Sequence, residues 1–376
     1  MTAFKIAILT EIISSHSGSR FAIELAKSLS KLGNNITLYA FNTNEDKSLT
    51  KSLKGKEIKV TTFKEKSGIL NKIKPHGKLT NILRKEKFNF AISCSKAPFF
   101  LSAKLAGIPV VKIYMGTQFN AYLENKLPHE RINFIDRIYN LWANLIIYLI
   151  DFLTLSLSTK IISISKYCAG ETKKLYFRKT DSIIYIGANH IKSKQTPVAQ
   201  KNSSINLLSV SRITPYKGFD KLISTVNHFP NKLTLTIVGT NVKPSYFAYL
   251  KRRSKKNIKF FINLSDQQLA HLYQKSDIYI TADKYLFFGL PIVEAAFFKK
   301  GTIAFSHAAA AELIENGKTG FLVTSEDKLK KALVNLIKKP NLIKTLGNNA
   351  YLKVHKDFTW QTIALKYQQL FEEWFK

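Results

Sequence analysis

The alternation of short, apolar β-type segments with helical segments constrains this chain more than any other feature. The first forty residues read as strand, loop, helix and strand, in the segments FKIAILTE, SSHSGSR, FAIELAKSLSKLG and NNITLYAF. In the third segment the apolar residues recur at helical spacing, at Phe21, Leu25, Leu29 and Leu32. Two strands joined by such a helix pair in parallel, because the crossover returns the chain to the same edge of the sheet.

A second series of the same kind follows a polar stretch at residues 191–204, IKSKQTPVAQKNSS, which reads as a linker. Six further strand-like segments come after it: INLLSVSR, LTLTIVG, IKFFI, IYITA, TIAFS and GFLV. Ser265 and Gln268 form a capping box at the start of one intervening helix. We therefore expect an α/β chain of two doubly wound domains that face a central cleft, with ligands beyond the carboxyl ends of the strands.

Composition excludes several other classes of protein. The 376 residues are 45% hydrophobic, which is typical of a globular chain and not of a disordered or integral membrane protein. Cys94 and Cys168 lie in apolar runs, so we expect reduced, buried thiols in a cytoplasmic protein, without a disulfide framework or a metal site. The N-terminus runs into a strand and lacks the cleavage site of a signal peptide.

The chain is strongly basic, with 58 Lys and Arg against 25 Asp and Glu and a net charge of +33. Such a surface attracts nucleic acid, an anionic membrane leaflet or phosphorylated ligands; the alternative is a solvated, lysine-rich surface. The stretch Lys47–Lys87 contains thirteen Lys and Arg and three Glu, mixed with apolar residues, which suits an anionic bilayer. A second basic cluster, KRRSKKNIK at residues 251–259, also fits a solvated face.

The most apolar stretch is LWANLIIYLIDFLTLSLS at residues 141–158, interrupted by Asp151. Its uncharged portions are too short for a membrane-spanning helix. It could line a path for a lipid tail, but we favour a buried helix of the first domain.

The segment SVSRITPYKGF places Arg212 and Lys217 in the loop after the first strand of the second domain. That loop is where a doubly wound sheet binds phosphate. Two cations five residues apart could clamp a diphosphate, Arg through its planar fork and Lys as a point charge. These two residues alone support equally well the alternative of two solvated loop cations.

Further along, Gly289-Leu290-Pro291 is a helix-start signal, because Pro is favoured at the first helical position. The backbone N–H groups at Gly289 and Leu290 would then favour an anion such as a diphosphate. We expect Glu294 in the first turn, where its carboxylate suits the other end of a nucleotide and accepts hydrogen bonds from two ribose hydroxyls. Taken alone, Glu294 could instead complement the helix dipole.

Several segments together resemble glycosyltransferase family 4. They are SRITPYKG, IVG, LYQKSDIYITA, FFGLPIVEAA, GTIAFSHAAAAELIENGKTGFLV and FTW, and more loosely the glycine loop around Gly18, YMGT, IISISKY and YIGAN. The resemblance covers essentially the whole chain and implies the GT-B fold. It implies a retaining, metal-independent transfer of a sugar from a UDP- or GDP-linked donor, without a further cofactor. It assigns the leaving diphosphate to Arg212 and Lys217 and the ribose to Glu294.

Two positions depart from the family pattern. A further glutamate usually precedes Glu294 in the motif, at the position that is Leu286 here. Asp283 is the nearest carboxylate that could contact the donor sugar, although we favour a solvated loop residue there. A histidine usually stands before the glycine of YMGT, at the position that is Met115 here. Nucleotide binding is therefore better supported than catalysis.

Three further positions bear on the same sites. The glycines usual before the late glutamate, Glu312, are Ala308 and Ala309 here, and their methyl groups could restrict the approach of a donor. His16 and His307 lie in loops near these sites and could supply a missing polar contact, although a lone loop histidine is more often incidental.

We predict an acceptor-binding domain at residues 1–190, a linker at 191–204, a nucleotide-sugar-binding domain at 205–358, and a C-terminal helix at 359–376 that packs toward the first domain. The leading function is a peripheral glycosyltransferase at the inner face of the membrane, with a lipid-linked or surface-glycan acceptor. The alternatives are a nucleotide-sugar-binding protein that has lost catalysis and, less favoured, a transferase directed at nucleic acid, for which the sequence contains no recognised motif.

Overall fold

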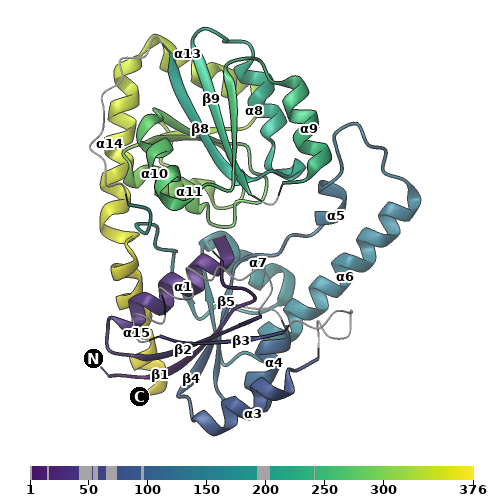
Figure 1. The fold of residues 1–376 in the computed structure, drawn as a ribbon, viewed down its shortest axis with the longest axis vertical. Coiled ribbons are helices and arrows are strands. Elements are labelled where there is room, and N and C mark those ends of the chain that lie inside the picture. Colours follow the sequence, from purple (N-terminus) through teal and green to yellow (C-terminus); the bar gives the residue numbers. More distant parts are fainter. Residues whose placement is uncertain are drawn as a thin grey trace. The chain divides into compact units, whose positions relative to one another are not determined.

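The structure is a computed structural model that describes residues 2–14, 17–41, 53, 58–64, 74–94, 97–192, 204–240 and 242–376 (Figure 1). The chain divides into two compact units. Unit 1 comprises Met1–Thr117, Asn144–Gly187 and Trp360–Lys376, and unit 2 comprises Gln118–Ala143 and Ala188–Thr359. Much of the basic region Lys47–Lys87, linker residues 193–203, and His16 lie outside the described residues.

Unit 1 is built on a parallel sheet, which has seven strands among the described residues. They are β1 (Lys5–Leu9), β2 (Asn35–Phe41), β3 (Lys59–Phe63), β4 (Phe90–Ser93), β5 (Val110–Tyr114), β6 (Lys160–Ser163) and β7 (Ser182–Ile183). Their order is β3-β2-β1-β4-β5-β6-β7, so the chain reverses its direction of travel across the sheet between β1 and β4. Both of these strands are almost completely buried, as expected for a parallel sheet covered on both faces.

The helices of unit 1 flank this sheet: α1 (Ser17–Ser30), α3 (Gly77–Glu86), α4 (Ala97–Leu105), α7 (Lys166–Tyr176) and α15 (Trp360–Phe375). Helix α15 packs against α1, with the ring centroids of Phe21 and Trp360 5.9 Å apart. Gly18 was expected in a loop but lies in the first turn of α1. That expectation was wrong because the small polar residues that favour loops also favour helix starts.

Unit 2 contains a second parallel sheet, with six strands among the described residues. They are β8 (Ile205–Arg212), β9 (Leu233–Thr240), β10 (Ile258–Ile262), β11 (Ile278–Thr281), β12 (Gly301–Phe305) and β13 (Gly320–Val323). Their order is β10-β9-β8-β11-β12-β13, so the reversal lies between β8 and β11. In open α/β sheets this switch point is where ligands bind, beyond the carboxyl ends of the strands.

The helices of unit 2 are α5 (Ala121–Glu124), α8 (Phe219–Val226), α9 (Pro244–Arg253), α10 (Asp266–Lys275), α11 (Leu290–Phe297), α12 (Ala310–Leu313), α13 (Glu326–Lys338) and α14 (Pro340–Asp357), with a 3-10 turn, η2, at Pro215–Lys217. The predicted capping box of Ser265 and Gln268 is present at the start of α10. The predicted fold class, two doubly wound α/β sheets in tandem, is confirmed.

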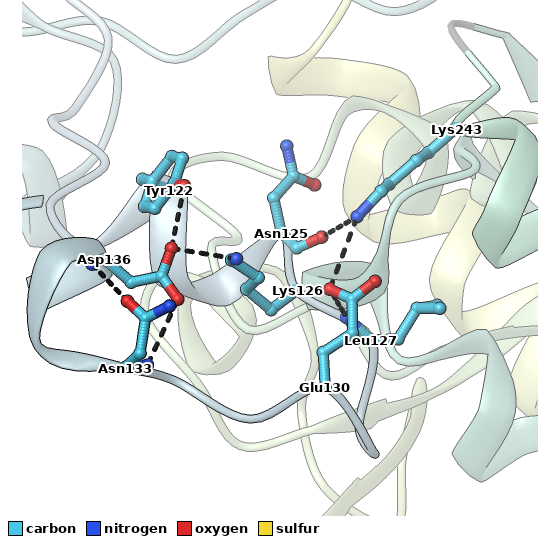
Figure 2. A network of polar contacts seen from close by, with 8 residues as sticks. All are labelled: Tyr122, Asn125, Lys126, Leu127, Glu130, Asn133, Asp136 and Lys243. Atoms are coloured by element: carbon cyan, nitrogen blue, oxygen red, sulfur yellow. Dashed lines mark hydrogen bonds and ion pairs between the residues drawn. The ribbon is translucent and has the colours of Figure 1, made fainter. Parts of the chain in front are cut away.

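One segment from the first half of the sequence, Gln118–Ala143, belongs to unit 2. Leu127 is part of the apolar core of that unit. Figure 2 shows how Lys243 holds the segment: its Nζ donates to the backbone oxygen of Asn125 at 2.5 Å and lies 4.0 Å from Glu130 Oε2. The predicted boundaries at residues 190, 204 and 358 stay a prediction, and this segment is where the compact units differ most from them.

A second part of the same network fixes the end of this segment (Figure 2). Asp136 accepts a hydrogen bond from Tyr122 Oη at 2.9 Å and pairs with Lys126 Nζ at 2.9 Å. The hydrogen bond from Lys126 is the main reason that the pKa of Asp136 lies below its usual value. The Asn133 side chain accepts from the Asp136 backbone N–H at 2.8 Å and so caps the helix that follows.

That helix, α6 (Phe134–Ser156), contradicts two expectations. The apolar stretch was expected to be buried, but the Leu141, Trp142 and Leu149 side chains are 67%, 59% and 53% exposed. It was also expected to be too short to span a membrane, whereas α6 is long and apolar enough by length and composition to do so. The sequence suggested burial because apolar side chains in a water-soluble protein are usually covered.

Candidate functional site

The loop after β8 brings Arg212 and Lys217 to the switch point of unit 2. Arg212 is the last residue of β8, and Lys217 ends the 3-10 turn η2. The next residue, Gly218, has a φ of +67°, and a Cβ on it would lie 2.8 Å from the backbone oxygen of Ala282. Only glycine fits such a close approach in the left-handed region. This contact presses the loop against the chain that leaves β11.

The two predicted cations lie beside the same aromatic ring. The Arg212 guanidinium carbon is 5.6 Å and the Lys217 Nζ is 5.2 Å from the ring centroid of Tyr216. Arg212 is exposed, whereas Lys217 and Tyr216 are buried. The structure therefore places Arg212 and Lys217 beside the same residue, and their role as a diphosphate clamp stays a prediction.

Asp283 is the partner of Lys217. Lys217 Nζ donates to Asp283 Oδ2 at 2.5 Å, and the two side chains are 9% and 10% exposed. The other carboxylate oxygen of Asp283 accepts from the Tyr285 backbone N–H at 2.9 Å. The favoured expectation of a solvated loop residue at Asp283 is therefore wrong. The pairing of β8 with β11 brings the loops that carry Lys217 and Asp283 together, and the sequence does not show which strands pair.

Further cationic groups surround this pair. His307 is exposed, and its pKa is lowered by partial burial and by the charges of Lys221 and Lys284, against the opposite effect of Asp283. Lys221 Nζ lies 5.6 Å from the ring centroid of Phe305, at the end of β12. The sequence analysis singled out His307 but missed Lys221 and Lys284. Their signals were the position of Lys221 one helical turn after Lys217 and that of Lys284 directly after Asp283.

The start of α11 has the geometry of an anion-binding helix terminus. Gly289 is its N-cap residue with a φ of +92°, and Leu290 is the first helical residue. Gly289 supplies no capping side chain, Pro291 has no N–H, and the Ile292 N–H donates to Gly289 O at 2.9 Å, so the N–H of Leu290 is the one in this turn without an intrahelical partner. A Cβ on Gly289 would lie 3.0 Å from the Leu286 side chain.

Glu294 is the fifth residue of α11, so the expectation that it lies in the first turn is wrong. Pro291 occupies the second helical position, which moves the start of the helix one residue earlier than expected. The Glu294 side chain is buried: Oε2 accepts from Tyr273 Oη at 2.8 Å, and His190 Nε2 lies 3.2 Å from Oε1. Sequence reasoning missed both Tyr273 and His190, because neither lies near Glu294 in the sequence.

The departures from the family pattern are visible in the structure. Leu286 is buried, and its backbone oxygen accepts from the Ala309 N–H at 2.9 Å, which ties the loop before α11 to the loop after β12. Ala308 has a φ of +47°, in the left-handed region that glycine adopts without strain. Glu312 lies in α12 and is half-buried.

In unit 1 the segment YMGT follows β5. Met115 is half-buried, and Gly116 has a φ of +92°. Thr117 Oγ1 donates to Asp151 Oδ2 and lies 2.9 Å from Tyr176 Oη. The loop after β5 is thereby held against the end of α6, which carries Asp151.

A second carboxylate lies at the same end of β5. Glu171 Oε2 accepts from Tyr114 Oη at 3.3 Å and from the Thr117 N–H at 3.4 Å. Burial raises the pKa of Glu171 to about 7, and the negative charge of Asp151 adds to this effect. The group therefore titrates near neutral pH.

The match to a known protein family lies within unit 2. Residues 192–353 match the family described as "Glycosyl transferases group 1". A probable sucrose-phosphate synthase from Thermosipho melanesiensis is 29% identical over 182 residues, which are 46% of this chain and 42% of that protein. This chain therefore spans less than half of the length of that relative.

Two solved structures extend the similarity to the whole chain. A glycosyltransferase from Rickettsia africae has a TM-score of 0.76 at 20% identity, with 100% of both chains covered. The Anabaena protein HepE, solved with UDP and glucose, has a TM-score of 0.76 at 16% identity, with 98% of this chain and 99% of that chain covered. The chain thus has the two-domain GT-B fold, and its residues 192–353 match the group 1 glycosyl transferase family.

Proposed function

We propose that the protein is a retaining, metal-independent glycosyltransferase of family 4 that uses a UDP- or GDP-linked sugar. The observation that carries the proposal is the cationic group at the carboxyl ends of β8, β11 and β12. It lies at the switch point of the domain that matches group 1 glycosyl transferases. The structural neighbour HepE binds UDP and glucose, which favours a uridine nucleotide.

In this proposal the diphosphate lies between Arg212, Lys217 and the N–H groups of Gly289 and Leu290. Asp283 neutralises part of the charge of Lys217, and the remaining N–H groups of that ammonium stay available for a phosphate oxygen. Arg212 is exposed and can engage two phosphate oxygens with its planar fork. These charges would stabilise the diphosphate as it leaves the sugar.

The transfer itself needs little from protein side chains in this mechanism. The bond between the anomeric carbon and the diphosphate oxygen breaks, and the acceptor oxygen bonds to the same face of that carbon. The proton of the acceptor passes to an oxygen of the leaving diphosphate. The protein contributes positioning and charge stabilisation.

We assign the ribose to Glu294. Tyr273 holds one carboxylate oxygen at 2.8 Å and so fixes the orientation of the group, as a rigid second layer does in many binding sites. The ribose hydroxyls would share the oxygen atoms with Tyr273 and His190, because a carboxylate accepts about four hydrogen bonds. Asp283, the candidate contact for the donor sugar, is engaged with Lys217, so we assign it first to holding that cation.

A second candidate is a protein that binds the nucleotide sugar without turnover. Leu286, at the position of the missing glutamate, is buried and apolar, and Met115 replaces the histidine. Neither side chain can exchange a proton or accept a strong hydrogen bond from a sugar. Binding without turnover would select this candidate.

We further propose a lipid-linked or surface-glycan acceptor, a place at the cytoplasmic face of the membrane, and the basic stretch Lys47–Lys87 as a contact with anionic lipid. The support is the net charge of +33. Each basic residue near an anionic surface contributes on the order of 1 kcal/mol at low ionic strength.

Calorimetric titration of the full chain with UDP and with GDP tests the donor site. We expect saturable binding of one nucleotide and a loss of about 10- to 100-fold in Arg212→Ala, because a charge-assisted hydrogen bond is worth about 1.5–3 kcal/mol. Arg253→Ala is the matched control: Arg253 is also exposed and lies 5.4 Å from the ring of Tyr249, but at the end of α9. If neither nucleotide binds the folded protein, the proposed donor site is wrong.

Turnover is measured separately, as release of the nucleoside diphosphate from the sugar donor that the titration selects. Release with acceptor-containing membrane extract, and none without it, supports the transferase. Activity that disappears with EDTA and returns with a divalent cation would contradict the metal-independent mechanism.

A further inference from the structure

Helix α6 (Phe134–Ser156) has the reverse of the polarity expected on a protein surface in water. Eleven of its large apolar side chains are at least 36% exposed: Phe134, Ile135, Ile138, Tyr139, Leu141, Trp142, Leu145, Ile146, Leu149, Phe152 and Leu153. An ordinary surface helix turns such side chains toward the core and its polar ones toward water. We call these eleven side chains the outward face of α6.

Two polar side chains in the first half of α6 lie on its protein side. Asp136 and Asn140 are each 6% exposed, and Asn140 Nδ2 donates to Asn120 Oδ1 at 2.9 Å. Asp136 is bound by Tyr122 and Lys126, as Figure 2 shows.

The second half of the helix repeats this pattern. Asp151 accepts hydrogen bonds from Thr117 Oγ1 and from Tyr176 Oη, the latter at 3.1 Å. Asp136, Asn140 and Asp151 are thus each bound by protein partners, whereas the side chains of the outward face are exposed. A contiguous exposed apolar surface of this length marks an interaction site.

Charge distinguishes between the two main candidates for covering the outward face of α6, which are a second copy of the chain and an anionic bilayer. Each copy of the chain carries +33, so pairing two copies through α6 works against mutual repulsion, whereas an anionic bilayer attracts the chain. The exposed charged residue within α6 is Arg137, and Arg131 is exposed shortly before it. Tyr139 and Trp142 on the outward face are the side chains that favour the boundary between lipid headgroups and acyl chains.

The inward carboxylates argue for a helix that lies on the bilayer and does not cross it. Asp136 and Asp151 are fifteen residues apart, about 22 Å along a helix. Because the hydrocarbon core is about 30 Å thick, a crossing helix would carry at least one of them into hydrocarbon, where a carboxylate is costly. A helix that lies in the interface plane buries its apolar face in lipid and keeps these groups on the protein side.

We propose that the outward face of α6 docks the protein on an anionic bilayer, with the helix lying in the interfacial plane. The inference deepens the proposed function, on which it rests for the acceptor: Asp151 ties α6 to Thr117, in the loop after β5, so a lipid-linked acceptor would reach unit 1 from this surface. It adds a lipid contact to the one proposed for the basic stretch Lys47–Lys87.

Co-sedimentation with vesicles tests the surface directly. The full chain is mixed with vesicles of phosphatidylcholine containing phosphatidylglycerol, at physiological ionic strength and without nucleotide. We expect binding, and a loss of at least tenfold in affinity for the double variant Leu141→Asn/Leu145→Asn, which places two polar groups one helical turn apart on the outward face.

The matched control is Phe177→Asn/Leu352→Asn, which also removes two large exposed apolar side chains, 81% and 71% exposed, at positions outside α6. We expect this control to bind vesicles like the unchanged protein. All four substitutions change exposed side chains, so we expect both double variants to fold. Thermal unfolding that matches the unchanged protein confirms this.

Tryptophan fluorescence gives a second measurement. Trp142 is 59% exposed, whereas Trp360 is buried and Trp374 is half-buried. We expect a blue shift of the emission on addition of vesicles, and its loss in Trp142→Phe. A shift that persists in this variant would place the lipid contact elsewhere and overturn the proposal.

The other outcomes also decide the question. Vesicle binding by Leu141→Asn/Leu145→Asn equal to that of the unchanged protein, or no binding by the unchanged protein, overturns the proposal. A dimer in light scattering that the same variant dissociates, without vesicle binding, assigns the face to a second copy and also overturns it. Nucleotide titration without vesicles is independent of these results, so failure of the donor site and failure of the docking surface are distinguishable.

Discussion

The two sheets place opposite charges at the carboxyl ends of their strands. In unit 2, Lys217 beside Arg212 pairs with Asp283 after β11, and the charges of Lys221 and Lys284 act on His307 after β12. In unit 1 the end of β5 holds two carboxylates, Asp151 and Glu171, among tyrosine hydroxyls. The same parallel topology therefore presents a cationic edge in one unit and an acidic, hydrogen-bonded edge in the other. Topology fixes where chemistry takes place, and the loop residues decide which chemistry it is.

The largest effect should come from breaking the ion pair at the cationic edge. Lys217→Met leaves Asp283 mostly buried without its counter-ion, and we expect the free energy of unfolding to fall by about 3–5 kcal/mol in urea titrations. Adding Asp283→Leu should recover much of this loss, because the uncompensated charge is then gone.

The control for this pair is the surface contact between Lys318 and Glu315, whose side chains are 69% and 44% exposed. Lys318→Met should change the free energy of unfolding by less than about 1 kcal/mol, since exposed ion pairs contribute little. Equal losses in Lys217→Met and Lys318→Met would show that the cationic edge is not held by its buried pair.

A smaller effect should follow from Gly289→Ala at the start of α11. A φ of +92° and a contact of 3.0 Å with Leu286 both oppose a Cβ, so we expect the free energy of unfolding to fall by about 1–2 kcal/mol. Gly317→Ala is the control, because Gly317 has a φ of +79° but no atom within 4 Å of the new Cβ. Gly289→Ala should cost more than Gly317→Ala, and only Gly289→Ala should weaken nucleotide binding. A Gly289→Ala protein that binds nucleotide normally would remove the helix start from the donor site.

The sequence predicted the features that depend on neighbours in the chain. Helical spacing and β-rich runs predicted the alternating elements, and the capping box of Ser265 and Gln268 is local. Arg212 and Lys217 were found because five residues separate them. The Lys217–Asp283 pair and the Tyr273–Glu294 hydrogen bond were missed, because they depend on which strands and helices become neighbours.

The sequence-based prediction of burial was wrong for helix α6. The apolar stretch at residues 141–158 predicted a buried helix, because apolar side chains are usually covered by protein. Nothing in its composition distinguishes a helix covered by protein from one that faces outward. The polar spacing carried the missing signal: Asp136, Asn140 and Asp151 share the inward side of α6, which a pattern of apolar residues alone does not show.

The contribution of Glu171, at the acidic edge of unit 1, to the free energy of unfolding should depend on pH. The pKa of Glu171 is raised from 4.5 to about 7 by burial, so the folded state binds this proton more tightly than the unfolded state. Its contribution favours folding below about pH 4.5 and is lost as the pH rises through about 7. Glu171→Gln cannot titrate, so its stability relative to the unchanged protein should increase between pH 5 and pH 8. A stability difference that stays constant across this range in urea titrations would contradict the raised pKa.

The smallest expected change in stability concerns two residues with a positive φ, one after a strand in each unit. Unit 1 has Gly116 after β5 with a φ of +92°, whereas unit 2 has Ala308 after β12 with a φ of +47°. Ala308→Gly relieves the strain of a Cβ in this region, which costs roughly 1–2 kcal/mol, but it also makes the unfolded chain more flexible. We expect a net gain of about 0.5–1 kcal/mol in the free energy of unfolding. Ala332→Gly, inside α13, should lose about 1 kcal/mol. A loss of stability in both variants would mean that Ala308 is not strained. The loop after β12 would then accommodate an alanine methyl group at a positive φ without a cost in free energy.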